Sequence, residues 1–260
     1  MLKTIIMASA AGIIGTGIGG ILGLLFGASS KKAMSYVLSF ASGVMLSIVC
    51  FDLIPESLTL GGLGLVILSI IGGIGVVQIL NTVIDRITNS KETHVEPEEL
   101  RHQKEILSKE SKQSFLKSGI IMLSAIALHN LPEGLAIGSG ASHDTQLGMT
   151  LAILIALHNI PEGMSIAVPL VAGGMKKGKV ALLTALSGAP TLLGGLLGAV
   201  LGNMGNFMVA SSLGIAAGAM LYVTYCEILP EVILLNKGRR PALFTIGGII
   251  FGLVITRIMV

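Results

Sequence analysis

Residues 126–134 read IALHNLPEG, and residues 155–163 read IALHNIPEG. Eight of the nine positions are identical, and both copies lie within long apolar stretches. Each copy carries a histidine, an asparagine and a glutamate. Ionisable side chains are costly at membrane depth, so each one there suggests a function or a specific partner. This duplicated polar stretch decides how the rest of the chain is interpreted.

The composition is that of a polytopic membrane protein. Of the 260 residues, 52% are hydrophobic and only 12% are charged, and the mean hydropathy is +0.87. A soluble domain of this length needs more charge to cover its surface. The net charge is +3 and no basic stripe is interleaved with aromatic residues, so no nucleic acid is expected as a partner. The lipid bilayer is the surrounding that this composition indicates.

Apolar windows of about twenty residues, the length that crosses ~30 Å of hydrocarbon as a helix, predict eight transmembrane helices. Together they form a single all-α transmembrane domain over 1–260. A polar connection at 85–117 is expected to be a cytoplasmic loop in which His94 and His102 are solvated. Glycines at every fourth position from Gly15 to Gly27 are interpreted as a close-packing helix face. The expected helices are 4–27, 33–58, 61–84, 118–140, 147–171, 179–202, 207–235 and 241–259.

The positive charges predict the orientation of these helices. Of the 17 lysines and arginines, 15 fall in the odd-numbered connections, and only Lys3 and Arg257 remain for the opposite side. Because positive residues accumulate in cytoplasmic loops, both termini are expected to be extracytoplasmic. An odd number of spans would scatter the charges over both faces, so the same count favours eight helices.

A second repeat lies further apart in the chain. Residues 43–56 contain Gly-Val-Met-Leu followed by Asp-Leu-Ile-Pro-Glu, and residues 218–231 contain Gly-Ala-Met-Leu followed by Glu-Ile-Leu-Pro-Glu, at a constant offset of 175 positions. In the predicted topology both matched pairs of helices are antiparallel. Helices one to three and six to eight are therefore interpreted as an inverted repeat around a central pair, helices four and five. Transporters built in this way place their substrate site near the midplane.

The duplicated stretch is a candidate metal site. In each copy the glutamate follows the histidine by four residues, so the two side chains share one helix face. Two imidazoles and two carboxylates suit a borderline divalent ion, Zn²⁺ first, with Fe²⁺, Mn²⁺, Co²⁺ and Cd²⁺ as alternatives. A buried His–Glu network that only joins helices is the competing interpretation, and two inverted copies disfavour it. The candidate ligands are His129, Glu133, His158 and Glu162, with Asn130 and Asn159 extending the same faces.

Other side chains are candidates for the path to this site. Met45 could present a thioether to it, whereas its repeat partner Met220 is interpreted as packing. One acidic pair is expected at each mouth of the path, and solvation at a helix end is an equal alternative for the second member of each pair. These pairs are Asp52 with Glu56, and Glu227 with Glu231.

The H-N-x-P-E-G motifs and the paired G-x-M-L helices resemble the ZIP family of Zrt/Irt-like proteins, particularly its bacterial branch. The resemblance covers essentially the whole chain. It implies eight helices, transport of Zn²⁺ and related ions into the cytoplasm by alternating access, and a homodimer. It also implies a primary metal site with Met45 and Asn159 as further ligands, and a second site. The primary site consists of His129, Glu133, His158 and Glu162, and the second of Asn130, Glu133, Asn159 and Glu162.

One residue departs from the family pattern. Bacterial relatives often carry a glutamate before the proline of helix six, where this chain has Ala189. Alanine cannot bind a metal, so the second site is expected to be weak or absent. The predicted function is uptake of zinc and related divalent ions across the cell membrane. An intramembrane zinc-dependent hydrolase is the alternative, and a non-catalytic membrane scaffold is disfavoured by the buried charges.

Overall fold

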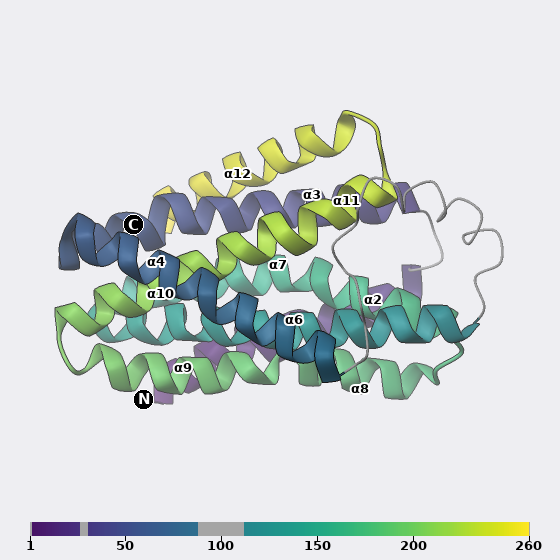
Figure 1. Cartoon of the computed structure of the whole chain (residues 1–260), viewed down its shortest axis with the longest axis horizontal. Coiled ribbons are helices and arrows are strands. Elements are labelled where there is room, and N and C mark those ends of the chain that lie inside the picture. Colours follow the sequence, from purple (N-terminus) through teal and green to yellow (C-terminus); the bar gives the residue numbers. More distant parts are fainter. Residues whose placement is uncertain (1, 27–30, 88–111, 260) are drawn as a thin grey trace.

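The computed structural model describes residues 2–26, 31–87 and 112–259, and the secondary structure of this part of the chain is helical (Figure 1). Much of the predicted loop 85–117, with His94 and His102, lies outside the described residues. Three stretches are π-helical, and they are labelled η. In order the elements are α1 Leu2–Ser9, η1 Ala10–Ile14, α2 Gly15–Phe26, α3 Lys31–Ser47, η2 Ile48–Leu53, α4 Ile54–Ile87, α6 Lys112–His143, α7 Thr145–Ala172, α8 Lys177–Ser187, α9 Ala189–Gly202, α10 Asn206–Val223, η3 Thr224–Ile228, α11 Leu229–Leu235 and α12 Arg240–Met259.

Six stretches of the described chain are long and apolar enough to cross a membrane: 2–25, 32–79, 145–172, 177–202, 206–235 and 240–258. This makes the chain a multi-pass helical membrane protein. The number is smaller than the eight expected from sequence for two reasons. The stretch 32–79 is continuous helix by hydrogen bonding and includes two expected spans, and α6 is not among the six.

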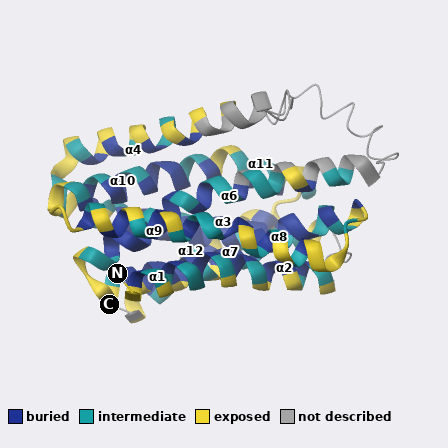
Figure 2. Ribbon diagram, turned by 90° about the horizontal axis from the view of Figure 1, so that it is seen from below, coloured by how far each residue is buried: buried dark blue, intermediate teal, exposed yellow. Residues whose placement is uncertain are grey.

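A glycine interrupts that long stretch. Gly62 has φ 72° and ψ 167° inside α4, a backbone conformation that residues with a Cβ rarely adopt. The chain changes direction there, and the remainder of α4 runs back along α10 (Figures 1 and 2). The connections α7–α8 and α11–α12 lie at one end of the bundle, and the two chain ends and the connection α9–α10 lie at the other (Figure 1).

The burial pattern is that of a protein in lipid. Large apolar side chains such as Leu68, Leu197 and Ile250 are exposed, while charged and polar groups are buried. The exposed positions lie along the outer helices and at the ends of the bundle (Figure 2). The most interior stretches are α7 and α10 to α11, in which 67% of the apolar window is buried, against 22–39% for the other four. Polar groups that lipid could not solvate are therefore held between helices.

Small residues let the helices approach closely at four crossings. A methyl group added to Gly163 on α7 would overlap the carbonyl oxygen of Thr16 on α2, and one added to Gly134 on α6 would overlap that of Thr191 on α9. The crossings of α3 with α12 and of α4 with α10 are equally tight, at Gly43 against Thr245 and at Gly73 against Ile215 respectively. Close backbone approach through glycine is a common way for helices to associate in a membrane.

Candidate metal centre

The two copies of the duplicated motif lie on α6 and α7, which pack against each other in the interior of the bundle. Pro132 and Pro161 lie within these helices, one residue before each glutamate. The six polar side chains of the motifs are all buried, with at most 3% of any of them exposed. Four are ionisable, and the structure brings all four together: His129, Glu133, His158 and Glu162.

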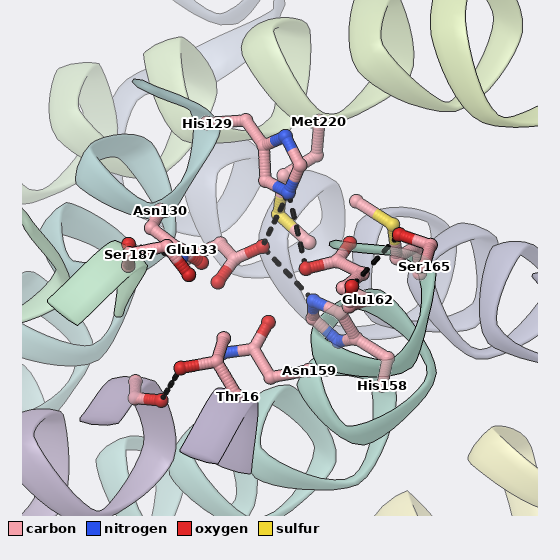
Figure 3. A network of polar contacts seen from close by, with 12 residues as sticks. Thr16, His129, Asn130, Glu133, His158, Asn159, Glu162, Ser165, Ser187 and Met220 are labelled. Atoms are coloured by element: carbon pink, nitrogen blue, oxygen red, sulfur yellow. Dashed lines mark hydrogen bonds and ion pairs between the residues drawn. The ribbon is translucent and has the colours of Figure 1, made fainter. Parts of the chain in front are cut away.

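Each histidine lies closer to the glutamate of the other motif helix than to the glutamate of its own helix. His158 Nε2 lies 2.9 Å from Glu133 Oε1, and His129 Nε2 lies 3.1 Å from Glu162 Oε2. Within α6 the distance from His129 Nε2 to Glu133 Oε1 is 4.0 Å. The two carboxylates lie between the two imidazoles (Figure 3). This crossed arrangement joins α6 to α7 through two His–Glu contacts.

These distances are close to those around a bound metal ion. Two ligands of one tetrahedral zinc, each at roughly 2.0–2.2 Å from the ion, lie about 3.3 Å apart. Ligand atoms of His129, Glu133 and Glu162 lie within 4.8 Å of one another. Nδ1 of His129, Oε1 of Glu162 and Oε2 of Glu133 are buried without a hydrogen-bond partner among the described residues. Buried polar atoms are normally paired, so this donor set suits a positively charged ion.

The two asparagines flank the carboxylates in the same manner. Asn130 Nδ2 donates to the carbonyl of Ser187 at 2.8 Å, and Asn159 Nδ2 donates to the carbonyl of Ala11 at 3.0 Å. Their Oδ1 atoms are buried without a hydrogen-bond partner in the described part of the chain. Both accepting carbonyls lie at irregular helix segments, in η1 and at the break between α8 and α9. The anchored amides thus leave an oxygen each for a further polar group.

Two methionines and one alanine complete the surroundings. Met45 and Met220 are both fully buried, and the Thr224 hydroxyl lies 3.8 Å from Met45 Sδ. Met220 is drawn beside His129 in Figure 3, although the sequence pattern assigned it to packing only. Ala189 begins α9, directly after the break at Gly188, and supplies no ligand atom.

The acidic pairs lie on η2, α4, η3 and α11, outside the two motif helices. Asp52 is buried in η2 and accepts a hydrogen bond from Thr256 at 3.0 Å. Glu56 pairs with His143, a residue that the sequence reasoning did not single out, at 2.9 Å between Oε1 and Nε2. Glu227 and Glu231 are half-buried on η3 and α11, and Glu227 is near enough to contribute to the electrostatic environment of His129. Sequence could have indicated His143 only through its position at the end of a span that also carries a histidine motif.

Comparison with known proteins supports the interpretation of this centre. Residues 81–259 match the model of the family described as ZIP zinc transporter. The chain belongs to the ZIP family. A zinc transporter ZupT of Chlorobium chlorochromatii is 32% identical over 258 residues, which cover 94% of this chain and 92% of the relative. ZupT proteins of Escherichia coli and Shigella flexneri are 32% and 31% identical, over 94% of this chain and 90% of each relative. This ZIP family member thus matches its relatives over nearly their whole length.

Proposed function

We propose that this chain transports Zn²⁺ and related divalent ions across the cell membrane and binds them at His129, Glu133, His158 and Glu162. The observation that carries the proposal is the pair of crossed His–Glu contacts, which collects two imidazoles and two carboxylates in the membrane interior. Its relatives of similar length are zinc transporters. Their names describe transport rather than catalysis, which favours a transporter over an intramembrane hydrolase.

The donor set selects a class of ion. Imidazole nitrogen with carboxylate oxygen suits zinc and its borderline neighbours, and Fe²⁺, Mn²⁺, Co²⁺ and Cd²⁺ are the further substrates that we propose. Because the ligands are at most 3% exposed, an ion cannot reach them unless the helices rearrange. This burial supports alternating access, with the hydrated ion exchanging water for protein ligands at the centre. Met45 and the asparagines are proposed as additional ligands.

We further propose that the chain crosses the membrane eight times as an inverted repeat. The glycine crossings support this proposal with helix contacts that involve residues outside the sequence motifs. Thr16 and Thr191, whose carbonyls meet Gly163 and Gly134, are separated by 175 positions. The other two crossings repeat the relation, since Gly43 meets Thr245 and its counterpart Gly218 meets Ile70, again 175 positions apart in each case. These four glycine contacts therefore form two pairs that the 175-residue offset relates.

Irregular helix segments support the same relation. The π-helical stretch η2 covers Ile48–Leu53 and η3 covers Thr224–Ile228, so their last residues are also 175 positions apart. The stretch η1 in the first repeat corresponds to the break between α8 and α9 in the second. Helix defects at equivalent depths are expected where a transporter rearranges around a central site.

We propose that both termini are extracytoplasmic, from the distribution of lysine and arginine. A test uses a variant in which Cys50 and Cys226 are replaced by alanine. New cysteines are then introduced by Asn203→Cys in the connection α9–α10 and by Lys177→Cys at the other end of the bundle. A membrane-impermeant thiol reagent on intact cells should label the Asn203→Cys variant and spare the Lys177→Cys variant. The opposite labelling pattern would reverse the orientation.

Transport is tested with the purified full-length chain in liposomes that contain a zinc-sensitive dye. External Zn²⁺ should raise the internal dye signal, and a hydrolase or a scaffold would leave it unchanged. The direction of net flux is proposed as uptake into the cytoplasm, and imposed gradients in the same liposomes would check it. We also propose a homodimer, which the mass of the detergent-solubilised protein would reveal.

Ala189→Glu is expected to raise the number of tightly bound zinc ions from one to two per chain. The new carboxylate would start α9 near the Asn130 side chain, whose oxygen lacks a hydrogen-bond partner in the described part of the chain. Zinc stoichiometry after equilibrium dialysis measures the change, and Ala189→Gln provides a control of similar size. Two tightly bound zinc ions in the unchanged protein would contradict the weakening assigned to Ala189.

A further inference from the structure

A His–carboxylate pair lies at one end of the bundle, apart from the central cluster. His143 is the last residue of α6, and Glu56 lies in the first turn of α4. Their Nε2 and Oε1 atoms are 2.9 Å apart, and the two side chains are 30% and 29% exposed. The pair is thus accessible to a hydrated ion, whereas the central ligands are almost fully enclosed.

The backbone on each side of the pair is anchored. Asp144 follows His143 and caps α7, where its side chain accepts a hydrogen bond from the Gln146 amide at 2.9 Å. Ser57 follows Glu56 and donates to the carbonyl of Ala210 on α10 at 2.7 Å. The imidazole and the carboxylate are therefore held by separate fixed points. An opening of a few tenths of an ångström would give the separation of about 3.3 Å that two zinc ligands require.

The pair also lies on the helices that lead to the centre. His143 follows His129 on α6 by 14 residues, about 21 Å along the helix axis. Glu56 comes four residues after the buried Asp52, so about one helical turn separates the two carboxylates. Asp52 is held by Thr256 and lies in η2, between α3, which carries Met45, and the first turn of α4, which carries Glu56. An ion bound at the pair would have one carboxylate between it and the central ligands.

We propose that Glu56 and His143 form a separate, weaker zinc site at this mouth of the transporter, which captures the hydrated ion before it moves to the centre. The inference rests on the proposed transport function and adds His143 as a ligand. The charged groups nearest in sequence are Asp52 and Asp144, both acidic, and the Arg257 guanidinium lies near enough to Asp52 to interact with it electrostatically. Two protein ligands leave coordination positions for water, which is suited to release toward the centre.

Binding is tested on the purified full-length protein in detergent, in a His129→Ala/His158→Ala background that lacks the central imidazoles. Calorimetric titration with Zn²⁺ should show one weak site. His143→Gln or Glu56→Gln should remove it, and the matched change His102→Gln in the polar connection should leave it in place. His143→Cys should restore it, because a thiolate binds zinc but does not form an ion pair with a carboxylate. Zinc binding that survives His143→Gln would overturn the inference.

Transport gives a second readout with an intact centre. His143→Gln should raise the KM for zinc uptake about tenfold and leave the maximal rate unchanged, because charge-lined entrances act on the association rate. A lower maximal rate with an unchanged KM would indicate a conformational latch between α6 and α4 instead, and would overturn the capture site. Failure of the transport proposal looks different, since the unchanged protein would then give no zinc signal in liposomes.

Discussion

Replacing Glu133 with alanine should lower the rate of zinc uptake by at least about a hundredfold. Losing a residue that only hydrogen-bonds to a metal ligand typically lowers activity about 10- to 100-fold, and losing a ligand itself should cost more. Glu133 lies within reach of both histidines, at 2.9 Å from His158 Nε2 and 4.0 Å from His129 Nε2. The substitution removes a ligand and leaves the His158 ring nitrogen buried without its partner. Initial rates of uptake in the dye-loaded liposomes measure the effect.

Two controls separate metal binding from folding. Glu133→Gln keeps the size of the side chain but removes its charge, and it should still lose most of the uptake. Glu110→Ala removes a carboxylate from the polar connection and should transport at the normal rate. If a Glu133→Ala/His158→Ala variant took up zinc as fast as the unchanged protein, the central cluster would not be the transport site.

The spacing within each motif predicts which side chains share a helix face, but it does not predict how two helices turn toward each other. His129 and Glu133 are four residues apart and were expected to act together. In the structure His129 lies closer to Glu162 of α7 than to Glu133 of its own helix. The relative rotation of α6 and α7 depends on the glycine crossings with α2 and α9, which are tertiary contacts.

Helix irregularities were the least predictable part of the fold. The stretches η2 and η3 each end two residues before a proline, Pro55 and Pro230, whereas η1 is followed by Gly15, so no single pattern marks all three. Each follows regular helix without a break in the chain. A π-helical turn accommodates one extra residue per turn, so packing on both sides decides where it forms. Gly62 shows the opposite case, since its φ of 72° strongly favours glycine and falls near the expected boundary between two spans.

His143 was missed because helix ends are weakly specified by sequence. The fourth span was expected to end at residue 140, whereas α6 continues to His143 and Asp144 caps the next helix. Three further residues bring the imidazole to Glu56 of α4, which is distant in the sequence. Such a pairing depends on the tertiary arrangement of α6 and α4, and the sequence pattern gave no indication of it.

Gly163→Ala and Gly134→Ala should each destabilise the protein by about 1–3 kcal/mol, the usual effect of overfilling a packed interior. Each glycine directly follows a motif glutamate, and the added methyl group would overlap a carbonyl oxygen, that of Thr16 or that of Thr191. The backbone cannot yield as a flexible side chain would, so α2 or α9 must move away from the central pair. The free energy of unfolding in detergent measures the effect.

Gly75→Ala is the matched control, because a methyl group at this helical position meets nothing within 4 Å. It should leave stability unchanged or raise it slightly, since alanine favours helix over glycine. If the two motif glycines are equivalent members of an inverted repeat, their alanine variants should also weaken zinc binding to a similar extent. If Gly134→Ala were as stable as Gly75→Ala while Gly163→Ala were strongly destabilised, the two motif glycines would not be equivalent, and the inverted repeat would be contradicted at these crossings.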